Sequence, residues 1–113
     1  MAIENDIYSV LSPLVGGRVY PLITPEEPTK PYIVYQVVSN VSQVSLSGPT
    51  GLSRRRVQVD VYDLTYAGMK GLEPQVESAM AGAAFQGIPI LYHEVYEPLV
   101  KLFRNIMEFS VWS

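Results

Sequence analysis

The stretch from residue 54 to residue 63 constrains the fold of this chain more than any other part of its sequence. Val57, Val59 and Val61 fall on one side of an extended chain, and mostly polar side chains fall on the other. The second set is Arg54, Arg56, Gln58, Asp60 and Tyr62. This period of two is typical of a strand with one buried and one polar face. We therefore predict the central strand of a small α+β domain, with its polar face available to a partner.

The length and composition of the chain favour one folded domain. A chain of 113 residues has the size of a single domain, which we place at residues 1–113. Apolar residues make up 48% and charged residues 17%, which excludes a disordered chain. This much apolar character exceeds what one small core hides, so we expect an oligomer. The net charge of −3 argues against general binding to a nucleic-acid backbone.

The sequence also carries signals about the compartment in which the protein is made. It contains no cysteine, which excludes a disulfide framework and thiolate chemistry. Residues 1–15 contain Glu4 and Asp6 but no lysine or arginine, which does not fit a signal peptide. No apolar run approaches the roughly 18 residues that span a bilayer, so we expect no membrane partner. These features suit a reducing cytoplasm.

Hydrophobic periodicity predicts two helices in the element order α-β-β-β-α-β-β. The first helix is expected at about residues 2–15, from an apolar stripe at helical spacing. The second follows Thr65, a good capping residue. Pro74 costs a helix interior about 3 kcal/mol, which predicts a kink near 71–74 or a start delayed to about Leu72. We expect both helices on one face of a small mixed or antiparallel sheet.

The strands are expected at residues 19–22, 32–38, 54–63, 88–96 and 104–112. The run 32–38 is continuously β-branched or aromatic apart from one glutamine, which predicts a strand covered on both faces. Its pairing is expected to continue weakly through residue 46, so that residues 32–63 form a long hairpin. Pro89 suggests that its strand lies at a sheet edge or begins at this residue. Prolines and glycines predict flexible loops at about 23–31 and 46–54.

Residue types that carry catalysis are scarce, so we expect no enzymatic activity, no cofactor and no metal. His93 is the only histidine, and Glu94 beside it points to the opposite face of its strand. A half-exposed strand residue is therefore favoured over a general base. Asp60 and Asp63 also face opposite ways, which does not fit a shared metal ion. The glycine-rich segment 48–51 lacks the lysine of a phosphate-binding loop.

Nucleic-acid binding is a minor alternative. Arg54, Arg55 and Arg56 form the one basic cluster and could contact phosphates. They stand in an acidic chain, and successive strand residues diverge, which favours a solvated strand start or ion pairs between subunits. The eight tyrosines could stack on bases. Strand faces and protein interfaces use tyrosine equally, because it offers a large contact area with a polar tip.

Several short segments, taken in order along almost the whole chain, carry a resemblance to a known family. They include Gly-Arg-Val-Tyr-Pro at 17–21, Lys-Pro-Tyr-Ile-Val-Tyr-Gln at 30–36, Arg-Val-Gln-Val-Asp-Val-Tyr-Asp at 56–63, Thr-Tyr at 65–66 and Phe-Ser-Val-Trp at 109–112. The chain resembles the tail-completion, or head–tail joining, proteins of long-tailed bacteriophages and prophages. It departs at Gly68, Gly71 and Pro74, where the family usually has a plain alanine-rich helix.

The resemblance implies a structural protein without enzymatic activity. Such a subunit forms a ring, typically hexameric, at the head-proximal end of the tail. The ring ends the growth of the tail tube and docks to the connector or adaptor proteins of the head. DNA then passes through the channel without specific binding. The resemblance thus implies a virion location after assembly in the bacterial host cytoplasm, with partners that are other copies, the tail-tube protein and the connector.

A closed ring needs two different contact patches on each subunit. The candidates are the polar face of 54–63, the proline-rich loop at 24–31 and the hairpin tip at 47–53. The candidate interface residues are Arg54, Arg55, Arg56, Gln58, Asp60, Glu26, Glu27 and Lys30. An alternative from another functional class is a small cytosolic module that binds a ligand or peptide along its exposed sheet edge.

Overall fold

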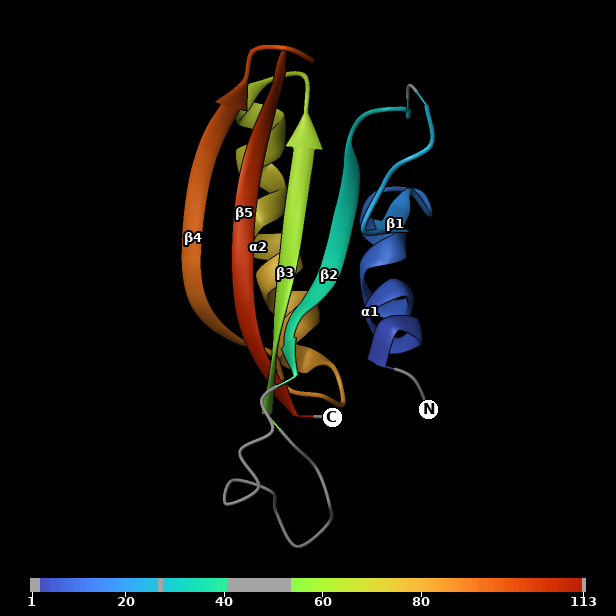
Figure 1. Cartoon of the computed structure of the whole chain (residues 1–113), viewed down its shortest axis with the longest axis vertical. Coiled ribbons are helices and arrows are strands. Elements are labelled where there is room, and N and C mark those ends of the chain that lie inside the picture. Colours follow the sequence, from blue (N-terminus) through green and yellow to red (C-terminus); the bar gives the residue numbers. More distant parts are fainter. Residues whose placement is uncertain (1–2, 27, 41–53, 113) are drawn as a thin grey trace, which may run out of the picture.

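The sheet is built around β3 (Arg54–Asp63), which lies at its centre, as the alternation predicted. In this computed structural model, which describes residues 3–26, 28–40 and 54–112, five strands follow the order β1-β2-β3-β5-β4. The others are β1 (Val19–Pro21), β2 (Tyr32–Asn40), β4 (Ile88–Glu97) and β5 (Leu102–Trp112). Figure 1 shows β4 at one side of the molecule and β1 at the other.

The sheet is mixed, because β1 runs parallel to β2 and every other neighbouring pair is antiparallel. The ladder between β3 and β5 extends from Arg54 opposite Trp112 to Asp63 opposite Phe103. Two helices, α1 (Ile3–Leu11) and α2 (Tyr66–Gly82), complete the elements in the predicted order. The predicted α+β class and element order are therefore confirmed.

The core lies between the helices and one face of the sheet. Val57, Val59 and Val61 are fully buried, and α2 packs against β3 and β5 while α1 contacts α2 and β1. The other fully buried large side chains are Ile7, Leu11, Val15, Ile33, Met69, Val76, Met80, Met107 and Phe109. Each such side chain contributes about 1.5–3 kcal/mol through its burial. One face of the sheet is thus committed to packing, which leaves the opposite face open.

The first helix is shorter than predicted. It ends at Leu11, and a 3₁₀ turn follows at Ser12–Leu14, with Pro13 inside it. Pro13 was expected to disturb the last turn of this helix, and the structure has a 3₁₀ turn there, because proline lacks the N–H that an α-helix would need. Gly16 and Gly17 follow with φ of 60° and 85°, the left-handed conformation that lets the chain turn into β1.

The prediction that β2 is covered on both faces was wrong in part. Ile33 and Tyr35 point into the core, whereas Val34 and Gln36 on the other face remain half-exposed. The hairpin with β3 is confirmed, with a register shift between Val37 and Ser39. The expected pairing beyond residue 40 and the loop at 46–53 lie outside the described residues. The loop at 23–31 holds no helix or strand in the part that is described.

The second helix begins where its capping residue predicts. The Oγ1 atom of Thr65 accepts a hydrogen bond of 3.0 Å from the backbone N–H of Gly68. The helix then continues through Pro74 to Gly82, so the expected delay to Leu72 was wrong. Buried side chains such as Met69 hold the first turns on the sheet, which outweighs the local cost of proline.

The presence of glycine at position 68 has a steric explanation. A Cβ atom at this position would lie 2.1 Å from Oδ2 of Asp63, a distance that no real side chain tolerates. Asp63 itself closes the turn, because its Oδ1 accepts a 2.7 Å hydrogen bond from the N–H of Leu64. The glycine therefore lets the last residue of β3 approach the start of α2.

The strand β4 lies at the sheet edge, as Pro89 suggested. Its register against β5 shifts between Pro89 and Leu91, and its first residues, including Ile88, are exposed. Among the described residues, none of the helices has the length and apolar character needed to cross a membrane.

Replacing Thr65 with alanine should lower the free energy of unfolding by about 1 kcal/mol, because the Gly68 N–H loses its capping acceptor. Urea unfolding followed by circular dichroism measures the change. Thr65→Ser keeps an acceptor oxygen and serves as the matched control, with stability close to that of the unchanged chain. Equal losses in both variants would show that the hydroxyl does not cap α2.

Candidate functional site

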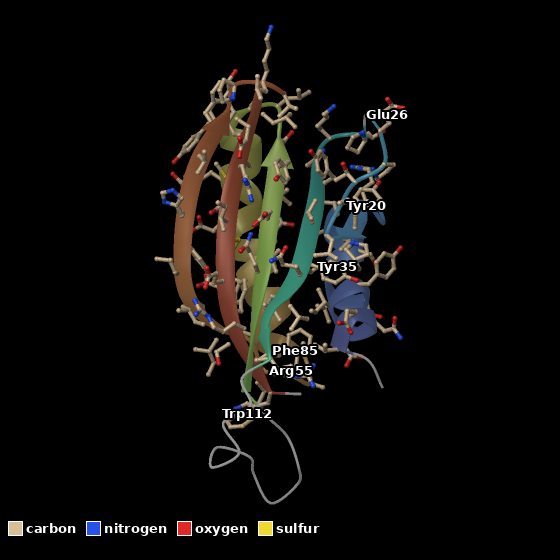
Figure 2. All side chains as sticks on the ribbon, in the orientation of Figure 1. Tyr20, Glu26, Tyr35, Arg55, Phe85 and Trp112 are labelled. Carbon is tan, nitrogen blue, oxygen red and sulfur yellow. The ribbon has the colours of Figure 1, made fainter. Side chains whose placement is uncertain are left out.

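The face of the sheet opposite the helices is the largest surface that the core does not use. Strand alternation places Arg56, Gln58, Asp60 and Tyr62 of β3 on it, because the valines between them point inward. The register adds neighbours from the flanking strands, which are Tyr32, Val34 and Gln36 of β2 and Arg104, Ile106 and Glu108 of β5. We call this surface the open face. Figure 2 shows its side chains on the ribbon.

Arg104 is the centre of the open face. Its Nη2 atom lies 2.7 Å from Oδ2 of Asp60 on β3, and its Nη1 atom lies 2.7 Å from Oε2 of Glu97 on β4. Gln58 donates from Nε2 to both carboxylate oxygens of Asp60 at 3.1 Å. Although burial works against the charged form, the hydrogen bonds to Glu97 and Asp60 raise the pKa of Arg104 above its ordinary value. One guanidinium group thus links three strands.

Two stacked tyrosines extend this cluster toward β2. The rings of Tyr32 and Tyr62 lie 4.8 Å apart with an interplanar angle of 12°, and the Arg104 guanidinium lies 5.5 Å from the Tyr62 ring centre. Burial, opposed by the charge of Arg104, raises the pKa of Tyr62 to about 12. The stack keeps Tyr32 only 6% exposed although no helix covers this face. The open face is therefore ordered by ring stacking and ion pairs.

The loop that follows β1 folds over one side of the open face and forms a hollow. Its volume is about 380 Å³. The lining residues are Leu22, Ile23, Thr24, Tyr32, Val34, Gln36, Gln58, Asp60, Tyr62 and Arg104. The two charged groups in this lining, Asp60 and Arg104, pair with each other, so the hollow has no net charge. Such a lining fits an uncharged or apolar protein segment.

A second polar cluster ties α2 to the last two strands. Lys70 forms ion pairs with Glu94 of β4 and with Glu73 on its own helix. Tyr66 donates a 3.0 Å hydrogen bond to Glu94, and the buried Asn105 of β5 donates a 2.9 Å hydrogen bond to Glu73. The hydrogen bonds from Lys70 and Tyr66 lower the pKa of Glu94. These contacts join elements of one subunit.

The structure separates the predicted arginine cluster. Arg56 lies exposed on the open face, where it pairs with Glu108 of β5. Arg55 points to the helix side, at the end of the sheet where the N–H of Trp112 bonds to the carbonyl of Phe85 (Figure 2). The side chain of Arg54 lies outside the described part. Arg55 and Arg56 therefore lie on opposite faces of the sheet and do not form one basic surface.

The other predicted residues are distributed as follows. Gln58 is half-buried on the open face, and Asp60, which pairs with Arg104, is only 5% exposed. Glu26 is exposed and Lys30 half-buried in the loop between β1 and β2, and Glu27 lies outside the described residues. The same loop lines the hollow above Gln58, which brings the two predicted patches into proximity.

Sequence reasoning missed Arg104 and Glu97, which complete the cluster. The only local signal was the position of Arg104 at the start of an alternating strand. Among the described residues, no group of three or more histidine, cysteine, aspartate or glutamate side chains is arranged to hold a metal ion. His93 is exposed on β4. The open face carries ion pairs, amide groups and tyrosines, which are side chains that protein interfaces use.

Comparisons with known proteins agree with this description. The model of a family described as "Tail completion protein gp17" matches residues 8–113. Among solved structures, a chain in the virion of a native gene transfer agent (GTA) particle is similar, with a TM-score of 0.68 and 16% sequence identity. The alignment covers 98% of this chain and 93% of that chain. At this identity the likeness shows the fold alone. A comparison with curated proteins gave no match.

Replacing Arg104 with methionine should lower the free energy of unfolding by about 1.5–3 kcal/mol, because the buried Asp60 carboxylate loses its charged donor. Urea unfolding measures the loss. The same replacement in an Asp60→Asn chain should cost clearly less, because the carboxylate charge is then absent. Equal costs in the two backgrounds would show that Asp60 and Arg104 are not coupled.

The raised pKa of Tyr62 predicts a loss of stability at alkaline pH. The folded chain holds the phenol proton up to about pH 12, whereas an unfolded tyrosine loses it near its ordinary pKa of 10.0. The resulting stabilisation is fully present below the unfolded pKa and is lost as the pH rises through the folded pKa. Urea unfolding at several pH values in this window measures the decline. Tyr62→Phe should flatten the profile, and an unchanged slope would contradict the assignment.

Proposed function

The chain belongs to the tail completion protein gp17 family, and from this premise we propose that it forms a ring at the head-proximal end of a phage tail. The ring is hexameric, ends the tail tube and joins it to the connector of the head. The observation that carries the proposal is the family match over residues 8–113. The GTA virion chain supports it, since a protein of the same fold is found in a phage-like particle.

The coarser statement does not depend on the ring. Members of this family are structural components of the virion, so the protein is a structural phage-tail protein and not an enzyme. The expectation of a non-enzymatic virion component is thereby confirmed. A small cytosolic ligand-binding module is therefore not favoured, because the family consists of structural virion components.

A closed ring requires two different contact surfaces on each subunit. Two candidates are the open face and the loop between β1 and β2. The open face presents Arg56 and Gln58 beside the neutral hollow. The loop between β1 and β2 presents Glu26 and Lys30. We retain these four residues, together with Arg54, Arg55, Asp60 and Glu27, as candidates for contact with other copies or with the tail tube. Asp60 acts through Arg104, because it is itself covered.

The proposed channel lets DNA pass without specific binding. A net charge of −3 supports this, because phosphate binding needs clustered basic side chains. The separation of Arg55 and Arg56 onto opposite faces of β3 also supports it, because these two side chains do not form one basic patch.

The proposal predicts that purified protein caps tail tubes. Added to a preparation of growing tubes, it should place a ring at one end of each tube and stop further lengthening. Electron microscopy of negatively stained samples measures ring occupancy and tube length. Tubes that grow as before, with bare ends, would overturn the proposed role while leaving the family assignment intact.

Arg56→Glu provides a variant for the same assay. Arg56 is exposed, so the change should leave the fold intact while placing like charges beside Glu108 on the open face. Reduced capping by a folded variant would place Arg56 in the interface, whereas unchanged capping would remove it from the candidates.

A further inference from the structure

The three most exposed large apolar side chains of the described residues lie in two connections of the sheet. Leu99 is 98% exposed, Ile23 80% and Leu22 67%. Leu99 and Val100 lie in the turn between β4 and β5, and Leu22 and Ile23 lie in the loop after β1. Single exposed apolar residues are ordinary, but a group of them marks a contact surface.

These side chains form two separate patches on opposite edges of the sheet. The strand order β1-β2-β3-β5-β4 places the β4–β5 turn at one edge and the β1–β2 loop at the other. Figure 1 shows both connections toward the same end of the molecule, on its left and right sides. In a head-to-tail ring, each subunit uses one patch toward its left neighbour and a different patch toward its right neighbour. The two patches meet that requirement.

The patches also carry opposite charges. Glu26 is exposed in the loop, and Lys101 is exposed in the turn directly after Val100. Neither side chain takes part in the ion pairs found within the described ranges. Figure 2 labels Glu26 at the edge of the molecule, on the side away from β4. Although Lys30 lies in the same loop as Glu26, it is only half-exposed, so the exposed Glu26 at one edge and Lys101 at the other can pair between two copies.

Among the described residues, two of the three non-glycine residues with a positive φ lie in these connections, and the third is Gln86, before β4. Leu22 has φ of 64° and Lys101 has φ of 56°, both in the left-handed region that crowds any residue with a Cβ atom. Glycine would adopt either turn without strain. The presence of leucine and lysine at strained positions indicates that their side chains serve more than the turn itself.

We propose that the β4–β5 turn of one subunit packs against the β1–β2 loop of the next. Leu99 and Val100 cover Leu22 and Ile23, and Lys101 pairs with Glu26 of the neighbouring copy. This inference rests on the ring of the proposed function and names its lateral contact. The occupant is a second copy of this chain, because both patches are apolar and they carry the opposite charges of Glu26 and Lys101.

Disulfide trapping tests the contact directly, because the natural chain contains no cysteine. Ile23→Cys and Leu99→Cys are introduced together, and the protein is oxidised after assembly on tail tubes. A ladder of covalent dimers, trimers and larger species is expected, since each copy links to two neighbours. The control combines Ile23→Cys with Ile88→Cys, which is 51% exposed at the other end of β4 and should give no ladder.

The outcomes separate this contact from the ring itself. Rings on tubes without a ladder, or an equal ladder in the Ile88 control, would overturn the proposed contact and leave the ring standing. Bare tubes would overturn the proposed function and this contact with it. Charge reversal gives a second readout: Lys101→Glu should lower the ladder yield about fivefold, and adding Glu26→Lys should restore it. An unchanged ladder yield in both variants would exclude the ion pair between Lys101 and Glu26.

Discussion

The complete burial of three alternate valines of β3 is the constraint on which this structure depends. Because Val57, Val59 and Val61 all face the helices, strand alternation places the side chains between them on the open face. A carboxylate such as Asp60 could not remain there half-covered without a partner. Arg104 of the adjacent strand supplies that partner and extends the link to β4. Apolar burial on one face thus sets the polar order on the other.

Local periodicity was enough to predict the element order and the central strand, because both follow from spacing along the chain. It failed where packing between segments distant in the sequence determines the start of a helix or the coverage of a strand. Pro74 argued for a late or kinked second helix, yet α2 begins at Tyr66, because the Thr65 cap and the buried Met69 stabilise its first turns. The coverage of β2 was overestimated, since an apolar run does not reveal that tyrosine stacking, and no helix, protects its outer face.

The candidate site was predictable only in part for a related reason. Alternation along β3 correctly placed Arg56 and Gln58 on a polar face. It carried no information about Arg104, which is 44 positions from Asp60 in the chain and meets it only through the register of β3 with β5. For the same reason the alternation could not distinguish an accessible aspartate from a buried one. Residue spacing predicts which face a side chain occupies, and register decides what covers it.

The start of β4 affects how strongly the unassembled protein tends to aggregate. An exposed edge strand is a template on which further strands can add without limit. Here Pro89 has no N–H to offer such a strand, and the register shift between Pro89 and Leu91 interrupts the straight ladder that a newcomer would need. The apolar residues around it can therefore stay exposed while the protein is concentrated, because fibre growth along this edge is blocked.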